Sequence, residues 1–354
     1  SSGAGGQAIR VGGRPNPKFK SASFISVIMG CLKCCAIAIP LLALLAPLGL
    51  SLLMNGWMNE YVPPKGWSID RMPDMSGKVA IVTGPTINGI GYESCVELAK
   101  KGAHVILAGR SKSKGDAALE ALKERVPTAR AEFMALDLGS MQSVKAFAAA
   151  FLQRNLPLHI LLNSAGVMAN PFTLTTDGIE SQFGTNHIGH FLLTKLLLHV
   201  LEKSAPARVI SVSSAAAFIP EGFPIASFGT GVNFTDIHAD SKSRYEPWKA
   251  YGRSKLANVL FASALDKRVA GKRIYVNSCH PGGIKTNLAR HLEAEMSETA
   301  VSFLQSFQDY VSMTSNQGAL TQLYLATSPE IEEKEIRGQY FYPQARRIQP
   351  PKFA

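Results

Sequence analysis

A tyrosine and a lysine stand four positions apart in the segment Tyr251-Gly252-Arg253-Ser254-Lys255. On a helix this spacing places both side chains on one face. A free phenol has a pKa near ~10, which is too high for proton transfer at neutral pH. A neighbouring ammonium group lowers that pKa by stabilising the phenolate. The pair therefore predicts a general acid–base centre, with chance spacing of two surface residues as the alternative.

Two hydroxyl groups, those of Ser213 and Ser214, directly follow the apolar run 208–212. A hydroxyl at the end of a buried strand can donate a hydrogen bond to a substrate carbonyl and stabilise the charge that develops on its oxygen. The alternative is a helix N-cap, for which serine is also favoured.

Residues 83–91 have the sequence TGPTINGIG and separate an apolar, β-branched run from a helical pattern. A glycine-rich turn in this place lets backbone N–H groups approach a pyrophosphate at the helix N-terminus. The motif alone is equally compatible with a plain turn. The order of strand, turn and helix favours the nucleotide site.

The elements that must position these residues alternate along the chain. Short apolar runs predict strands, and amphipathic segments between them predict helices. We expect strands at 79–82, 104–108, 131–136, 159–162, 208–212, 274–278 and 338–341, and helices at 92–101, 117–125, 144–154, 191–201, 249–269 and 317–326. The alternation predicts an α/β fold with a Rossmann-type, doubly wound parallel sheet of about seven strands. Such sheets bind ligands at the carboxyl ends of their strands.

In this order the motifs resemble the short-chain dehydrogenase/reductase superfamily, from about Ser76 to Pro343. The sequence Asn-Ser-Ala-Gly at 163–166, after the fourth strand, belongs to the same pattern. The segments 186–194, 254–261 and 280–283 are similar to the retinol dehydrogenase and WW-domain oxidoreductase branch, to which protochlorophyllide reductases are related.

The resemblance implies a role for each of four catalytic residues. Tyr251 would exchange a proton with the substrate oxygen, and Ser214 would orient the substrate carbonyl. Lys255 would lower the pKa of Tyr251 and bind the nicotinamide ribose. Asn186 would hold a water connected to Lys255. Hydride would pass directly between the nicotinamide and the carbon that bears the oxygen.

The expected cofactor site is larger and draws on the turn after each strand. Its members are Gly84, Asn88, Gly89, Ile90, Gly91, Arg110, Asp137, Leu138, Asn163, Ala165, Gly166, Tyr251, Lys255, Pro281, Gly282 and Thr286. By the resemblance, residues after the fourth strand would line the adenosine, Asp137 and Leu138 would meet the adenine, and residues after the sixth strand would contact the nicotinamide end. No metal site is expected.

The residue after the second strand decides the choice of nicotinamide cofactor. Enzymes of the NAD type place an acidic residue near this point to bind the ribose 2′-hydroxyl. This chain has Gly109 and Arg110 there. A guanidinium group can pair with a 2′-phosphate, so we expect NADP(H) in preference to NAD(H). The alternative is that Arg110 is a solvated loop residue.

Two features depart from the family pattern. Four residues separate Gly84 from Gly89, one more than usual, and the first of them, Pro85, has no N–H group to offer. Phosphate binding is therefore expected to be weaker or differently shaped. The segment 215–248, which precedes Tyr251, is long and suggests a lid or a partner surface.

The segment that precedes this domain predicts membrane attachment. Residues 24–54 contain one charge, Lys33, and are long enough to span a bilayer as a helix. Pro40 and Pro47 would either kink one helix or break it into two short halves, and a signal peptide is a further alternative. We divide the chain into a basic flexible arm (1–23), a membrane anchor (24–54), a linker (55–75), the dehydrogenase domain (76–343) and a tail (344–354).

The composition limits the remaining possibilities. Hydrophobic residues make up 46% of the chain, which excludes a disordered protein, and five cysteines exclude a disulfide scaffold. The net charge of +11 is spread along the chain, which favours anionic ligands or a membrane surface over nucleic acid. The basic start at Ser1, rich in glycine and serine, is typical of a processed organellar protein. We expect a mitochondrial or plastid membrane, with the endoplasmic reticulum as the alternative.

Two functions follow from the sequence. The first is a membrane-anchored, NADP(H)-dependent oxidoreductase that interconverts a lipophilic alcohol and carbonyl, with a small lipophilic substrate and membrane lipid as partners. The second is an accessory subunit of an organellar membrane protein complex that keeps the dehydrogenase fold. The altered glycine turn, the long segment 215–248 and the extended termini favour the second function, whereas the intact catalytic set favours the first.

Overall fold

The computed structural model of the chain describes residues 67–218, 245–284, 313–343 and 345–348. The predicted arm and membrane anchor lie outside these residues, as do most of the linker and most of the segment 215–248. None of the helices within the described ranges combines the length and the apolar character that a bilayer crossing requires.

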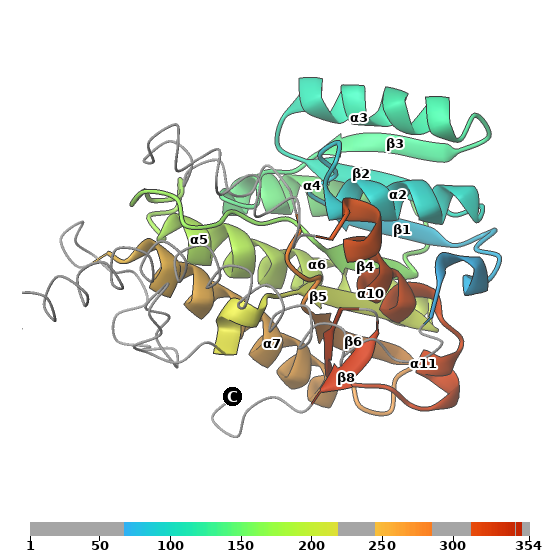
Figure 1. Cartoon of the computed structure of the whole chain (residues 1–354). Coiled ribbons are helices and arrows are strands. Elements are labelled where there is room, and N and C mark those ends of the chain that lie inside the picture. The colour runs from blue at the N-terminus through green and yellow to red at the C-terminus, as the bar shows by residue number, and fades with distance from the viewer. Residues whose placement is uncertain (1–66, 219–244, 285–312, 344, 349–354) are drawn as a thin grey trace, which may run out of the picture. The chain divides into compact units, whose positions relative to one another are not determined.

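A single eight-stranded sheet forms the centre of the described domain, in the order β3-β2-β1-β4-β5-β6-β7-β8 (Figure 1). Seven strands are parallel, and β8 pairs with β7 in the antiparallel sense. The strands are β1 (Val79–Thr83), β2 (His104–Gly109), β3 (Arg130–Ala135), β4 (Ile160–Asn163), β5 (Ala207–Val212), β6 (Ile274–Cys279), β7 (Tyr340–Tyr342) and β8 (Arg346–Ile348). The predicted parallel sheet is confirmed. The eighth strand was not predicted, because its charged sequence lacks an apolar pattern.

Helices cover both faces of this sheet. The α-helices are α2 (Ile90–Lys100), α3 (Lys112–Arg125), α4 (Met141–Gln153), α5 (Ser181–Phe183), α6 (Gly189–Lys203), α7 (Pro247–Arg268), α10 (Ser315–Thr327) and α11 (Glu330–Glu333). Short 3₁₀ turns lie at η1 (Ile69–Arg71) and η3 (Ala215–Phe218), and a π-turn, η2 (Gly184–Ile188), leads into α6.

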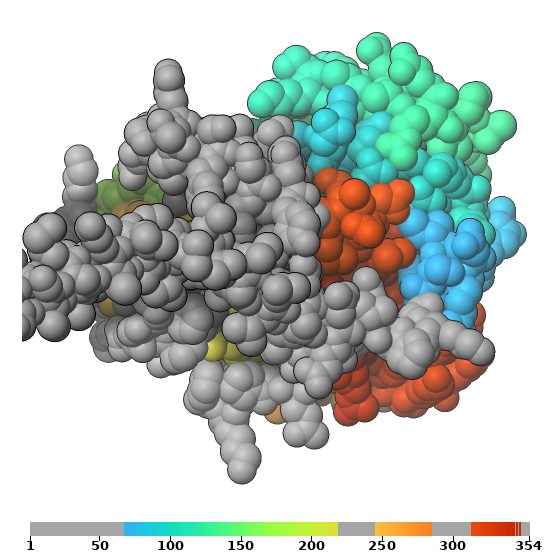
Figure 2. Space-filling model, in the orientation of Figure 1, coloured from blue at the N-terminus to red at the C-terminus, as the bar shows by residue number. Residues whose placement is uncertain are grey.

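The two faces bury separate hydrophobic clusters, because successive side chains of a strand point to opposite sides. In β1, Ala80 and Val82 pack with α2, α3 and α10, whereas Val79 and Ile81 pack with α4, α6 and α7. Figure 2 shows the orange-red surface of α10 directly beside the blue and cyan surface of the first described residues, from Trp67 onward. Gln322 of α10 donates hydrogen bonds to the Ile90 carbonyl and to Ser94 of α2. The C-terminal part of the chain thus completes the layer that starts with α2.

The end of the predicted linker packs on this domain. Trp67, Met72 and Met75 are buried in the α2–α10 cluster, and the ring of Trp67 lies 5.8 Å from that of Tyr324. Trp67, in the predicted linker, is therefore a core residue of the domain.

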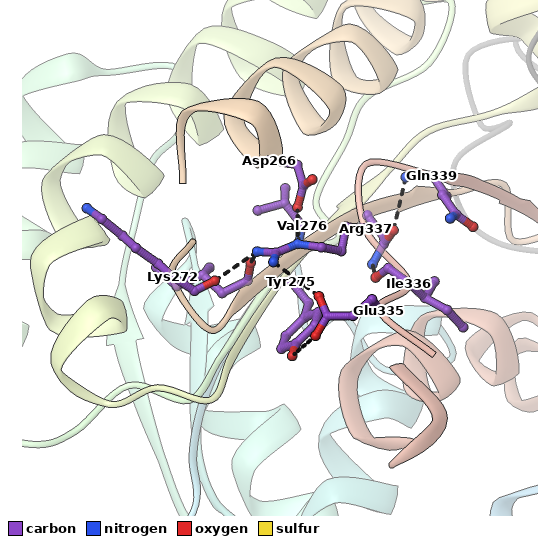
Figure 3. A network of polar contacts seen from close by, with 10 residues as sticks. Asp266, Lys272, Tyr275, Val276, Glu335, Ile336, Arg337 and Gln339 are labelled. Carbon is purple, nitrogen blue, oxygen red and sulfur yellow. Dashed lines mark hydrogen bonds and ion pairs between the residues drawn. The ribbon is translucent and has the colours of Figure 1, made fainter. Parts of the chain in front are cut away.

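A polar network fastens the segment before β7 to β6 and its preceding loop (Figure 3). The guanidinium of Arg337 donates to the carbonyls of Lys272 and Ile274, at 2.8 Å each, and pairs with Asp266 at 3.4 Å. The hydroxyl of Tyr275 donates to Glu335. These contacts position β7, which pairs with β6 at only two residues.

Candidate active site

The parallel strands bring the predicted site residues to one edge of the sheet. Each lies at or just after the carboxyl end of a strand: Gly84 after β1, Arg110 after β2, Asp137 after β3, Asn163 at the end of β4, Ser214 after β5 and Pro281 after β6. This is the edge at which open α/β sheets bind ligands.

Helix α7 places Tyr251 and Lys255 on one buried face. Their residues are only 5% and 4% exposed, and the Lys255 Nζ atom lies 5.7 Å from the centre of the Tyr251 ring. The Lys255 ammonium donates to the carbonyl of Val212, the last residue of β5, at 3.1 Å. Ser213 donates to the Lys255 carbonyl at 2.6 Å and ties the helix to the same strand end. Burial lowers the pKa of Lys255 to about 8.

The pKa of Tyr251 moves in the direction opposite to the prediction. Burial raises the pKa of its phenol to about 12, and a hydrogen bond with Ser214 opposes that rise only in part. The predicted lowering by Lys255 is wrong for this arrangement, because the removal of the phenol from water is the larger effect. The phenol therefore stays protonated at neutral pH.

Asn186 lies in the π-turn η2, and its side chain is fully engaged. The Val167 N–H donates to its Oδ1 atom at 2.8 Å, and its Nδ2 atom donates to the Val167 carbonyl and to Ser254, both at 2.9 Å. Its Oδ1 atom and the Nζ atom of Lys255 both lie close to Gly166, 3.2 and 3.3 Å from where a Cβ atom on that glycine would be. Asn186 thus joins the loop after β4 to α7 next to the ammonium group.

The glycine turn after β1 is closed by backbone contacts that only glycine permits. A Cβ atom on Gly91 would meet the Gly84 carbonyl at 2.7 Å, and one on Gly89 would meet the Thr86 carbonyl at 2.8 Å. Gly84 and Asn88 both have positive φ angles, +72° and +65°. Left-handed Asn88 accommodates the extra residue of the turn, since asparagine tolerates this conformation. Of these three glycines, Gly84 is the one whose backbone itself requires the freedom of glycine.

This turn fits a pyrophosphate. Gly89 is the N-cap of α2, and no side chain of the described residues caps its first N–H groups. Uncapped N–H groups at a helix N-terminus form an anion site. Ser315, at the start of α10, donates to the Asn88 carbonyl and braces the turn. The ring of Pro85 is turned towards β2, 3.4 Å from the position of a Cβ atom on Gly109.

The predicted adenosine side contains one orphaned acceptor. The Asn163 side chain is buried and donates to Thr194, but its Oδ1 atom has no partner among the described residues. A buried acceptor without a donor is costly unless a ligand or water satisfies it. Asp137 accepts a hydrogen bond from the Gly139 N–H, and the Leu138 carbonyl closely approaches Gly189. Both residues thus shape the rim through the backbone.

The remaining predicted cofactor-binding residues are Arg110 and those expected at the nicotinamide end of the site. The Arg110 side chain is exposed and forms no ion pair with the described residues. Pro281 and Gly282 follow β6, and Gly282 has a φ of +106°. Thr286, predicted to contact the nicotinamide, lies outside the described residues.

Sequence reasoning missed Ser254 and the hydroxyl of Thr83. Ser254 accepts from Asn186 and donates to the Tyr251 carbonyl at 2.7 Å. The Thr83 hydroxyl accepts from the N–H groups of Ser164 and Ala165 at 2.9 and 3.0 Å. The sequence gives only one indication of these roles: Ser254 directly precedes Lys255, and Thr83 directly precedes Gly84. The residues to which the two hydroxyls bond across the site are distant along the chain, so no local motif predicts the contacts.

The surroundings of Tyr251 are apolar on one side. Ala216, Met168 and Trp248 pack around it, and the rings of Trp248 and Tyr251 lie 6.2 Å apart in an edge-to-face arrangement. Within the described ranges, no group of histidine, cysteine, aspartate or glutamate residues is arranged to hold a metal ion.

The comparisons with known proteins agree with this geometry. The sequence profile of the short chain dehydrogenase family matches residues 78–226 and 237–297. Short-chain dehydrogenase TIC 32 A, chloroplastic, from Brassica napus is 41% identical over 275 residues, covering 76% of this chain and 81% of that protein. Human retinol dehydrogenase 14 is 36% identical over 315 residues, covering 84% and 88%.

A short chain dehydrogenase from Shigella flexneri, whose crystal structure contains NADP, shares the fold with a TM-score of 0.56 at 20% identity, covering 77% of this chain and 98% of that one. The family profile and the curated relatives confirm the predicted family and branch. The chain belongs to the short chain dehydrogenase family, in the branch of retinol dehydrogenase 14, and is an oxidoreductase.

Proposed function

We propose that the protein is an NADP(H)-dependent oxidoreductase that interconverts a lipophilic alcohol and a carbonyl. The observation that carries the proposal is the protonated, buried phenol of Tyr251, which forms a hydrogen bond with Ser214 and lies beside Lys255. An acid next to a hydroxyl donor suits a substrate whose oxygen gains charge during the reaction.

Each residue of the site has a separate role in the reaction. The nicotinamide cofactor supplies or accepts the hydride. In the reductive direction Tyr251 donates its proton to the substrate oxygen while Ser214 holds that oxygen in place. Lys255 contributes a positive charge and binds the cofactor ribose, and Asn186 keeps the loop after β4 against α7. In the oxidative direction Tyr251 accepts the proton of the alcohol, which requires its deprotonated form.

The preference for NADP(H) rests on the loop after β2. The Arg110 guanidinium has no ionic partner within the described domain and is exposed. Neither Gly109 nor Ser111 beside it is acidic, so a 2′-phosphate meets positive charge there.

The lipophilic substrate and the membrane location are supported by different parts of the chain. The apolar wall of Met168, Ala216 and Trp248 suits a hydrocarbon chain or ring next to Tyr251. The apolar segment 24–54 would bring the domain to a membrane in which such a substrate dissolves. The name of the Brassica napus relative, a chloroplastic protein, favours a plastid membrane.

Two variants test this proposal. Tyr251→Phe removes the acid and is expected to reduce NADPH-dependent turnover of lipophilic aldehydes by at least ~10²-fold while NADPH binding is kept. Tyr324→Phe, in α10 and away from the edge that carries the site, is the matched control. Arg110→Ala is expected to weaken NADPH binding and leave NADH binding unchanged. Unchanged turnover in Tyr251→Phe would refute the mechanism.

A second candidate function is that of an accessory subunit in an organellar membrane complex, which Pro85 in the enlarged glycine turn supports. Migration of the native protein only as a monomer or small oligomer in blue-native gels would exclude it.

A further inference from the structure

His190 is a buried histidine that the reaction described above does not use. It lies at the start of α6 and is 1% exposed. Its Nδ1 atom lies 2.9 Å from the carbonyl oxygen of Asn186, and its Nε2 atom lies 2.9 Å from the hydroxyl of Thr83. The ring thus connects a predicted catalytic residue with the end of β1, where the glycine turn begins.

The partners fix which nitrogen carries the proton. A carbonyl oxygen can only accept, so the Nδ1 atom carries the hydrogen and donates it to Asn186. In the neutral ring the Nε2 atom is then an acceptor, and the Thr83 hydroxyl must donate to it. Burial lowers the pKa of His190 to about 3, so the ring stays neutral at all working pH values.

The Thr83 hydroxyl is fully used in this arrangement. Its oxygen accepts from the N–H groups of Ser164 and Ala165. Its hydrogen goes to His190 at 2.9 Å in preference to the Leu162 carbonyl, which lies 3.4 Å away. Ala165 belongs to the predicted adenosine side, and the next residue, Gly166, lies next to the Asn186 side chain and the Lys255 ammonium. A continuous chain of hydrogen bonds therefore runs from the cofactor loop, through Thr83 and His190, to the backbone of Asn186.

We propose that His190 is a positioning residue that holds the carbonyl of Asn186 and the cofactor loop 163–166 in one fixed arrangement through the hydroxyl of Thr83. The inference rests on the proposed function, because it assigns the bridge a role in cofactor binding and turnover. The two ring nitrogens have different roles: Nδ1 donates to the Asn186 carbonyl, and Nε2 accepts from the Thr83 hydroxyl that holds the cofactor loop.

Two substitutions separate these tasks. In His190→Asn the side-chain amide nitrogen takes the place of Nδ1 and keeps the bond to Asn186, while the bond to Thr83 is lost. In His190→Gln the amide oxygen takes the place of Nε2 and keeps the bond to Thr83, while the bond to Asn186 is lost. One lost hydrogen bond corresponds to an effect of about tenfold or less.

The expected results differ between the two variants. His190→Asn raises the Kd for NADPH up to about tenfold and changes kcat at saturating NADPH by less than about twofold. His190→Gln lowers kcat up to about tenfold and changes the Kd for NADPH by less than about twofold. His159→Asn is the matched control, since His159 accepts from the Val79 N–H at the opposite end of β1. Because the asparagine oxygen can accept from the same N–H group, this variant is expected to change neither the Kd for NADPH nor kcat by more than about twofold.

The tautomer of His190 can be measured without an activity assay. In a two-bond ¹H–¹⁵N spectrum of the full-length protein labelled at histidine, His190 is expected to carry its proton on Nδ1 throughout pH 6 to 9. A proton on Nε2, or identical kinetic profiles for the two variants, would overturn the proposal. Wild-type turnover of NADPH tests the proposed function alone, so the two failures are distinguishable.

Discussion

Replacing Gly166 with alanine tests how closely the catalytic edge is packed. The new Cβ atom would lie 3.2 Å from the Asn186 Oδ1 atom and 3.3 Å from the Lys255 Nζ atom, closer than the 3.4–4 Å of ordinary contact. The φ angle of Gly166 is not in the left-handed region, so alanine is compatible with the backbone itself. The Asn186 and Lys255 side chains must therefore move away from the new methyl group by a few tenths of an ångström.

The cost of this movement falls on the Lys255 ammonium, whose bond to the Val212 carbonyl is already 3.1 Å long. Weakening one hydrogen bond from a charged group costs ~1.5 kcal/mol, which corresponds to about tenfold in kcat/KM. Crowding by the new methyl group lowers the stability of the folded protein. Alanine also restricts the unfolded chain, which restores up to ~1 kcal/mol. We therefore expect a net loss of about 1 kcal/mol in the free energy of unfolding.

The assay is NADPH oxidation with a lipophilic aldehyde, followed by absorbance, with thermal unfolding measured in parallel. Gly283→Ala is the matched control, because a Cβ atom there meets no described atom within 4 Å. Wild-type kcat/KM in Gly166→Ala would refute the reasoning, since it would show that Lys255 and Asn186 are not constrained by this glycine.

Two further predictions concern charge. Reductive kcat/KM is expected to fall as the pH rises above about 8, because Lys255 then loses its proton. Oxidation of the alcohol is expected to increase towards alkaline pH, because Tyr251, with a pKa of about 12, begins to ionise. Initial rates between pH 6 and 10 check both directions, and a flat reductive profile would contradict the role of Lys255. Arg337→Met removes the donor of two carbonyls and leaves Asp266 with the Val276 N–H only, so it is expected to lower the free energy of unfolding by about 2–3 kcal/mol in urea. Lys112→Ala, in an exposed ion pair, is expected to lower it by less than ~0.5 kcal/mol. Equal midpoints for these two variants would show that the network in Figure 3 adds no stability.

The sheet is the part of the fold that the sequence predicts well. Buried parallel strands are continuous apolar runs, and all seven predicted strands were found within a few residues of their expected places. Helix starts were less well predicted: α3 begins at Lys112 rather than 117, because Ser111 caps a first turn that contains Gly115 and no apolar stripe.

The candidate site was predictable in position but not in electrostatics. Strand ends and short motifs place Tyr251, Lys255 and Ser214 at one edge, since a parallel sheet gathers its carboxyl ends there. The raised pKa of Tyr251 depends on how completely the surrounding residues exclude water, which spacing does not reveal. The bridge through His190 links residues more than a hundred positions apart and likewise has no local signature.

Among the described strands, β3 and β8 form the two edges of the sheet, and they affect how the protein behaves at high concentration. An unpaired strand exposes N–H and carbonyl groups that can template aggregation with another chain. β3 carries Glu132, which pairs with His104 at 2.8 Å and Arg154 at 2.6 Å, and β8 carries the exposed Arg347. Addition of a foreign strand at either edge would crowd or desolvate these charges. Charge at both edges of the described sheet thus disfavours its extension by another chain.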